Sequence, residues 1–273
     1  MTAGQQPDAT AGQAKLWAAG EVYGPYVGRW SRLVAPRFLD WLEPPQDARW
    51  LDVGCGTGAL SGAILGRCAP VRVVDVDSSA GFLSYARRQV VDPRMEFHEG
   101  DAQSLPVAAG TFDLAVSGLV LNFVPDQAKG VEEMRRAVRK DGQVAAYIWD
   151  YANGMQMMRR FRDTAAQLDA GVAGRDESLR FPLCQPGPLK DLFEEAGMRG
   201  VEVTSIKVPT VSRDFDDYWR PFLGGGAPAP SYCMSHSEDR RAALRDRLQA
   251  ALPTNEDGSI HLTARAWAVR GTV

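Results

Sequence analysis

Arg49-Trp-Leu-Asp-Val-Gly-Cys-Gly-Thr-Gly58 is the stretch that decides the fold of this 273-residue chain, because a short apolar run leads directly into three closely spaced glycines. The run at 50–53 is typical of a buried parallel strand. The glycines allow a tight turn and leave the backbone open to a ligand, since they carry no Cβ. Residues 59–67 then indicate a helix whose N-terminus faces the same crevice. The stretch therefore predicts a ligand site at a strand-to-helix turn.

The spacing of these glycines distinguishes two kinds of nucleotide-binding loop. A dinucleotide loop has the pattern G-x-G-x-x-G, whereas this one has G-x-G-x-G, which argues against NAD. Residues 71–77, Val-Arg-Val-Val-Asp-Val-Asp, indicate the next strand. Its last acid, Asp77, lies 77 − 58 = 19 residues after Gly58, close to the spacing of a ribose-binding carboxylate.

Two more predicted strands end in small or acidic residues. The run 95–99 leads into Gly100-Asp101, and the run 111–116 leads into Ser117-Gly118. Because the carboxyl ends of parallel strands meet at one edge of a sheet, the glycine loop, Asp77 and Asp101 are expected to face one crevice.

These motifs together resemble a known family. Leu51-Asp-Val-Gly-Cys-Gly-Thr-Gly58, Val74-Asp-Val-Asp-Ser78 and Glu99-Gly-Asp-Ala-Gln-Ser-Leu-Pro106 are similar to the first three motifs of class I S-adenosylmethionine-dependent methyltransferases. The likeness continues through Leu121-Asn-Phe-Val-Pro-Asp126 and covers about residues 47–150. The nearest likeness is to small-molecule methyltransferases of the type 11 or ubiquinone-methylase-like branch. The resemblance implies in-line transfer of a methyl group to an O, N or C nucleophile of a small-molecule acceptor.

The resemblance also implies a donor site for S-adenosylmethionine, with S-adenosylhomocysteine as product. The residues that it implies for the donor are Asp52, Gly54, Cys55, Gly56 and Gly58 at the methionine part, Asp77 and Ser78 at the ribose, Asp101 and Ala102 at the adenine, and Ser117 at the methyl end. Tyr26 and Arg29 are expected to close over the donor, with Arg29 near its carboxylate. Asp77 or Ser78 taken alone could instead cap the helix expected at 80–90. The family usually has a small residue in place of Asp75, which leaves the adenosine contact of this strand open.

The predicted fold class is α/β: a Rossmann-like, seven-stranded, mainly parallel sheet with an antiparallel last strand, helices on both faces and a helical cap. Residues 28–42 carry apolar side chains at helical spacing, and the strands expected at 143–149, 201–208 and 257–269 complete the sheet. The expected division is a disordered tail at 1–13, an N-terminal helical cap at 14–46, the donor-binding α/β domain at 47–209 and 256–273, and an inserted substrate cap at 210–255.

The inserted segment and the ends of two strands supply the candidates for an acceptor site. These candidates are Asn122, Tyr151, Tyr218, Trp219 and Phe222. An acceptor pocket is typically apolar with a few polar groups, but aromatic residues at helical spacing more often form a core. No catalytic residue is assigned, because methyl transfer mainly needs a well-oriented nucleophile. None of the three histidines lies in a sequence pattern that indicates a catalytic base. No metal site is predicted.

Composition narrows the class of partner. A net charge of −3 argues against a nucleic-acid surface, and no run of about 18 apolar residues predicts a membrane span. Four scattered cysteines and a polar start without a secretory signal favour a reducing, cytoplasmic compartment. A homodimer is compatible with the sequence. Two other functions stay open: a non-catalytic S-adenosylmethionine-binding regulatory protein and, with less support, a nucleotide-dependent oxidoreductase.

Overall fold

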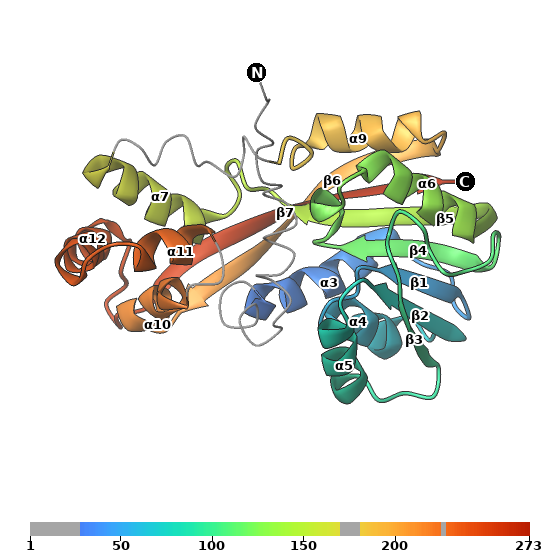
Figure 1. The fold of residues 1–273 in the computed structure, drawn as a ribbon, viewed down its shortest axis with the longest axis horizontal. Coiled ribbons are helices and arrows are strands. Elements are labelled where there is room, and N and C mark those ends of the chain that lie inside the picture. The colour runs from blue at the N-terminus through green and yellow to red at the C-terminus, as the bar shows by residue number, and fades with distance from the viewer. Residues whose placement is uncertain (1–27, 170–180, 225–227) are drawn as a thin grey trace, which may run out of the picture.

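A single seven-stranded sheet organises the molecule (Figure 1). The computed structural model describes residues 28–169, 181–224 and 228–273. The strands are β1 (Arg49–Val53), β2 (Arg72–Asp77), β3 (Met95–Glu99), β4 (Phe112–Gly118), β5 (Val138–Trp149), β6 (Arg199–Ser212) and β7 (Ile260–Thr272). Their order is β3-β2-β1-β4-β5-β7-β6, with β1 to β5 parallel and β7 antiparallel to both of its neighbours. The predicted fold class is confirmed, including the antiparallel last strand.

Helices pack on both faces of this sheet. In the described part of the chain they are α3 (Arg29–Leu42), α4 (Ala59–Arg67), α5 (Ala80–Gln89), η2 (Leu121–Phe123), α6 (Gln127–Ala137), α7 (Gln156–Leu168), α9 (Pro186–Glu195), α10 (Phe215–Trp219), η4 (Arg220–Leu223), α11 (Pro228–Met234) and α12 (Glu238–Ala251). Apolar side chains of α3 and α4 share one core with one face of the sheet, and those of α6 and α9 share a second core with the other face (Figure 1). The sheet is therefore buried on both sides, as its parallel strands require.

The amphipathic helix predicted at 28–42 is α3. Its buried side chains, among them Trp30, Val34 and Phe38, recur every three or four residues and face the sheet. The helix ends where Glu43 adopts a left-handed conformation (φ 49°), just before two prolines that cannot continue it.

The two last strands of the sheet extend beyond their neighbours. Only residues 266–272 of β7 pair with β5, whereas residues 260–265 pair with 207–212 of β6 beyond the end of β5. This two-stranded extension leads into α10, η4, α11 and α12, against which α7 packs (Figure 1). We call α7, α10, η4, α11 and α12 the cap. The sequence-based domain boundaries remain a prediction.

Several of the observed elements differ from the sequence-based expectation. Strand β5 starts at Val138, five residues earlier than predicted, because its first part pairs with β4 through an irregular register in which Asp141 is left-handed (φ 63°). The helix expected at 215–222 is divided into α10 and η4, since Pro221 lacks the N–H that an α-helix would use. Pro228–Met234 forms α11 where a flexible segment was expected at 224–230, of which 225–227 lie outside the described residues.

Candidate functional site

The glycine loop between β1 and α4 is held in place by β2. The N–H of Gly54 donates to the carbonyl of Val76 at 2.7 Å, and the N–H of Gly56 donates to Oδ2 of Asp77 at 2.9 Å. Gly54, Gly56 and Gly58 all have left-handed φ values of 75°, 55° and 78°. The loop thus lies at the carboxyl ends of β1 and β2, where open parallel sheets bind their ligands.

Two of these glycines are also required by close neighbours. A Cβ on Gly54 would lie 2.4–2.9 Å from side-chain atoms of Val120, and one on Gly58 would lie 2.9 Å from Val90. A Cβ on Gly56 would meet no atom within 4 Å. The middle of the loop therefore borders open space, whereas its two ends are packed.

Asp77 fastens this loop to the start of the next helix. Its second carboxylate oxygen, Oδ1, accepts the N–H of Ser79 at 2.8 Å. Only 9% of Asp77 is exposed, and burial raises the pKa of its carboxyl above the usual value against the effect of its hydrogen bonds. The side chain of Ser79, which accepts the N–H of Phe82, caps α5. Neither Asp77 nor the exposed Ser78 supplies that cap, so the capping alternative is not the arrangement found.

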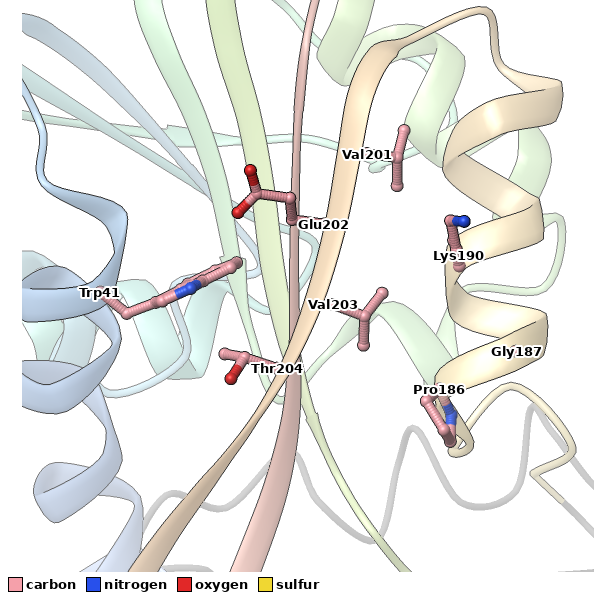
Figure 2. Close-up of a pocket in the computed structure, with 8 residues that line it drawn as sticks. All are labelled: Trp41, Pro186, Gly187, Lys190, Val201, Glu202, Val203 and Thr204. Atoms are coloured by element: carbon pink, nitrogen blue, oxygen red, sulfur yellow. The ribbon is translucent and has the colours of Figure 1, made fainter.

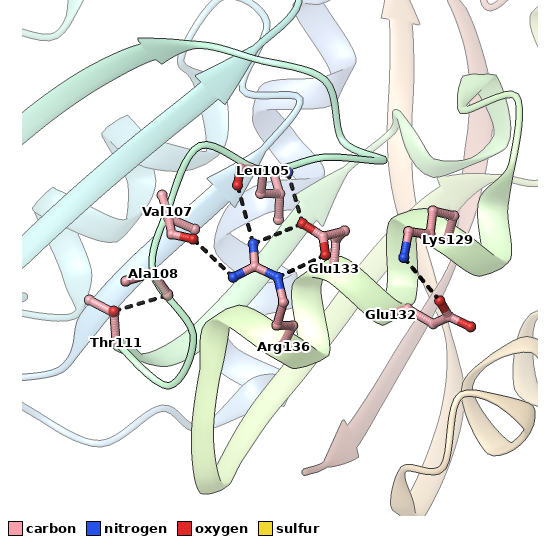
Figure 3. Close-up of polar contacts among 8 residues, drawn as sticks. All are labelled: Leu105, Val107, Ala108, Thr111, Lys129, Glu132, Glu133 and Arg136. Carbon is pink, nitrogen blue, oxygen red and sulfur yellow. Dashed lines mark hydrogen bonds and ion pairs between the residues drawn. The ribbon is translucent and has the colours of Figure 1, made fainter.

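The segment that follows β3 is anchored from α6. Arg136 donates to the carbonyls of Leu105 and Val107, and Glu133 accepts the N–H of Leu105 at 2.9 Å (Figure 3). Asp101, at the start of this segment, is exposed and accepts hydrogen bonds from the backbone N–H and the side-chain amide of Gln103. This anchoring positions Asp101 and the half-buried Ala102 next to the end of β2, to which Gly100 is bonded through the Asp77 carbonyl.

A group of buried polar side chains lies beneath the glycine loop. Asp52 and Asp75 are both 0% exposed, and the hydroxyl of Ser61 lies 2.7 Å from Oδ2 of Asp52 and 2.6 Å from Oδ1 of Asp75. Cys55, 7% exposed, adjoins them, and its burial raises the pKa of its thiol well above the usual value. The carboxyl of Asp52, which was expected at the methionine part of the donor, and the thiol of Cys55 are thus both buried beneath the loop.

The end of β4 approaches the same loop. Ser117 is 2% exposed and its hydroxyl donates to the carbonyl of Val53 at 2.8 Å, so it joins β4 to β1 and does not face the crevice. Val120 packs on Gly54 as described, and Leu119 is left-handed (φ 64°). Asn122 is 3% exposed, and among the described residues its amide nitrogen and oxygen have no hydrogen-bond partner.

Three aromatic rings gather after β4 and β5. The ring of Phe181 lies 5.2 Å from that of Phe123 and 5.5 Å from that of Tyr151, measured between centroids. Tyr151 was predicted from its place after a strand. Phe123 and Phe181 were missed, because no short sequence spacing links residues 58 positions apart.

The expected contact of Arg29 with the donor carboxylate is replaced by another partner. The guanidinium of Arg29 donates to both carboxylate oxygens of Asp217 in α10 at 3.2 Å, and to the hydroxyl of Ser212 at 3.4 Å. Arg29 therefore joins the start of α3 to the cap. Tyr26 lies outside the described residues.

The three cap aromatics predicted for the acceptor form the interior of the cap. Tyr218, Trp219 and Phe222 are 1%, 6% and 0% exposed, and Phe222 stacks on Phe161 with centroids 4.2 Å apart. The hydroxyl of Tyr218 donates to the carbonyl of Met157 at 2.9 Å. The physical reason for this correction is packing. The inserted helices cover little of the sheet, so they bury their large side chains against one another and against α7.

Other features of the described residues lie away from the loop. A depression of about 610 Å³ follows the outer edge of β6, with Trp41 of α3 on one side and Lys190 of α9 on the other (Figure 2). Three strands separate β6 from β1. His98 pairs with Glu96 on β3, and His261 contacts Ser259. Within the described ranges no cluster of three or more His, Cys, Asp or Glu side chains could hold a metal, and no helix is long and apolar enough to cross a membrane.

Comparison with known proteins gives a family for the central part of the chain. Residues 51–146 match the family described as "Methyltransferase domain". The chain is 38% identical over 117 residues to 2-phytyl-1,4-naphtoquinone methyltransferase of Thermosynechococcus vestitus, covering 42% of this chain and 51% of that protein. It is 30% identical over 174 residues to the malonyl-acyl-carrier-protein O-methyltransferase of Geobacter sulfurreducens, covering 63% and 62%.

A solved structure shows the same fold over nearly the whole chain. The phosphoethanolamine N-methyltransferase 2 of Haemonchus contortus, solved with phosphomonomethylethanolamine and S-adenosylhomocysteine, superposes with a TM-score of 0.55. It is 16% identical, and the match covers 97% of this chain and 58% of that one. The chain spans about half the length of several of the curated relatives that it matches. The resemblance predicted from the motifs is confirmed over residues 51–146.

Proposed function

We propose that this chain, whose residues 51–146 form a class I methyltransferase domain, transfers a methyl group from S-adenosylmethionine to a small-molecule acceptor. The observation that carries the proposal is the bond from the N–H of Gly56 to Asp77, which joins the glycine loop to a strand-end carboxylate at the edge where such sheets bind ligands. The curated relatives named above are a methyltransferase of a phytyl-naphthoquinone and an O-methyltransferase of malonyl-acyl-carrier protein.

The donor would lie along this strand edge. The open space over Gly56 and the backbone of Gly54 and Gly58 fit its methionine part. Asp77 accepts one N–H on each oxygen, so further lone pairs remain for two ribose hydroxyls, with Ser78 beside it. Asp101 and the backbone of Ala102 would face the adenine edge.

The acceptor would lie beyond β4. The carboxamide of Asn122 is buried without a partner in the described structure, and leaving such a group unpaired costs about 1–3 kcal/mol. A hydrogen-bonding ligand at the donor's methyl end would remove that cost. The rings of Phe123, Tyr151 and Phe181 supply apolar surface nearby, which suits a small organic acceptor.

The chemistry asks little of the protein beyond orientation. When bound, S-adenosylmethionine supplies a methyl group on a sulfonium, which is already activated toward a nucleophile. The chain's part is to fix the ribose through Asp77, to hold the loop through Gly54 and Gly56, and to keep the acceptor atom in line with the departing sulfur, which is catalysis by proximity. We assign no general base.

Isothermal titration tests this proposal. We expect binding of S-adenosylmethionine and S-adenosylhomocysteine, and loss of both in Asp77→Ala, with no binding of NADH. The matched control is Asp113→Asn, which removes a carboxylate bonded to Arg139 on the far end of β4. Binding of NADH alone would overturn the proposal in favour of an oxidoreductase. Donor binding without turnover across a metabolite library would favour the regulatory alternative.

Two finer expectations complete the proposal. All four cysteines are buried and free, which supports a reducing, cytoplasmic compartment. A homodimer stays a prediction, which light scattering coupled to size-exclusion chromatography tests.

A further inference from the structure

We propose that Asp75 is a positioning residue of the donor site that works as a neutral carboxylic acid and shares one proton with Asp52 through the hydroxyl of Ser61. The inference rests on the proposed function, because the loop that the three residues support is the loop assigned to the donor.

The distances require a proton between the two carboxyls. Oγ of Ser61 lies 2.7 Å from Oδ2 of Asp52 and 2.6 Å from Oδ1 of Asp75, both within the range of a strong O–H···O bond. A hydroxyl has one hydrogen and can donate to only one of these oxygens. The other short contact therefore needs a hydrogen on the carboxyl, which donates to Oγ of Ser61.

The surroundings offer no charge that could replace this proton. Both carboxyls are 0% exposed, and no lysine or arginine of the described chain contributes to the pKa of either one. The titratable groups that face them are the carboxyl of Asp77 and the thiol of Cys55, which add negative charge or none. Two buried carboxylates at this distance would both lose their hydration without compensation, and they would repel each other.

The same conditions decide which carboxyl keeps the proton. Burial raises the pKa of Asp52 to about 7. Burial, and then the neighbouring Asp52 carboxyl, raise the pKa of Asp75 well above its usual value. Both shifts favour a pair that retains a proton, and the pKa of Asp75 is raised further than that of Asp52.

The three residues come from the three elements that form the loop. Asp52 lies on β1 directly before Val53 and the loop, and Asp75 precedes Val76, whose carbonyl accepts the N–H groups of Gly54 and Cys55. Ser61 lies in the first turn of α4. A neutral Asp75 lets β1, β2 and α4 meet beneath the glycine loop, whereas a second charge would push them apart.

Thermal unfolding between pH 5 and 8 tests the proton without any ligand. A carboxyl with a raised folded pKa binds more protons folded than unfolded, so stability falls as pH rises above the unfolded value near 4. We expect the Tm of the wild type to fall relative to that of Asp75→Asn by roughly 5 °C or more over this range. Asp77 is common to both proteins, so its titration cancels. The Tm of Asp113→Asn should differ from that of the wild type by the same amount at every pH from 5 to 8. Asp113 has a lowered pKa and is ionised in both the folded and the unfolded state over this range.

Infrared spectroscopy reads the proton directly. The carboxylic C=O absorption of the folded wild type at pH 8, above the pKa of Asp52, should be reduced in Asp75→Asn and unchanged in Asp113→Asn. Equal pH slopes together with an unchanged carboxylic band would overturn the inference, even if the donor binds as proposed.

Donor affinity tests the positioning role. We expect Asp75→Ala to weaken S-adenosylhomocysteine binding about tenfold and Asp75→Asn to retain most of the affinity, since the amide keeps the shape and neutrality of the acid. If Asp75→Ala does not fold, Ser61→Ala, which removes the shared hydroxyl, replaces it. Equal affinity in the Ala and Asn variants would overturn the positioning role. If no protein binds donor while the Tm and infrared results hold, the shared proton stands and the proposed function fails.

Discussion

Two regions of the molecule differ in the kind of side chain that they bury. One is the strand edge formed by β1, β2 and α4, and the other is the cap formed by α7, α10, η4, α11 and α12. The strand edge buries carboxyls beneath a glycine loop, which is fixed by a few hydrogen bonds such as that from Gly56 to Asp77. The cap buries rings against rings, as Phe161 does with Phe222. The contrast separates the region that carries the candidate ligand site from the region that is stabilised mainly by aromatic packing. Substitutions in the cap should therefore lower mainly stability, whereas substitutions at the strand edge should also lower donor affinity.

The largest loss of stability is expected in the cap. Phe222→Ala removes a ring that is 0% exposed and stacked at 4.2 Å on Phe161, and such truncations lower the free energy of unfolding by about 3–5 kcal/mol. Chemical denaturation measures the loss. Leu223→Ala, at a neighbouring position that is 43% exposed, is the control and should stay within about 0.5 kcal/mol. The folded fraction of Phe222→Ala should still bind donor with wild-type affinity. A large loss of donor affinity would mean that the two regions are not separate.

The next largest effect is expected in the glycine loop. Gly54→Ala combines a left-handed backbone with a Cβ that overlaps Val120, and we expect it to cost about 2–4 kcal/mol of stability and at least tenfold in donor affinity. Gly56→Ala has the same backbone strain but meets no atom within 4 Å, so it isolates the strain alone. Adding Val120→Ala to Gly54→Ala should recover part of the stability. Equal losses in both single variants would show that packing on Val120 does not hold the loop.

The contrast also explains what the sequence could predict. The strand at 95–99, the helix at 59–67 and the glycine loop follow from patterns within a few residues and are observed with the expected bounds, and the strand predicted at 50–53 begins one residue earlier. The role of Ser61 could not be predicted, because an ordinary helix position reaches Asp52 and Asp75 only through packing. The partner of Arg29 lies 188 residues away, so no local pattern could indicate it. The cap aromatics were seen as a cluster, but only the fold decides that the cluster faces inward.

A smaller effect is expected where the N-terminal helix meets the cap. Asp217→Asn weakens the pair with Arg29, whose side chains are 17% and 31% exposed, and should cost about 0.5–1 kcal/mol. Burial opposes ionisation of Asp217, but hydrogen bonds from Arg213 and Arg29 outweigh it and lower the pKa. The pair therefore stabilises the fold fully above the unfolded pKa near 3.8, and the difference from the variant should be lost as pH falls through the lowered pKa of the folded state. Arg213→Gln, which alters a cation that is 80% exposed, is the control.

The smallest effect is expected from a pair with better geometry. Arg72 on β2 donates to both carboxylate oxygens of Glu96 on β3, at 2.7 and 2.6 Å, yet the two side chains are 40% and 45% exposed. Water and salt screen this pair, so Arg72→Gln should change the free energy of unfolding by about 0.5 kcal/mol or less, and donor affinity not at all. A double-mutant cycle with Glu96→Gln measures the coupling. A coupling well above 1 kcal/mol would mean that hydrogen-bond geometry outweighs exposure to solvent. Hydrogen bonding, more than burial, would then also explain how the buried carboxyls beneath the glycine loop affect stability.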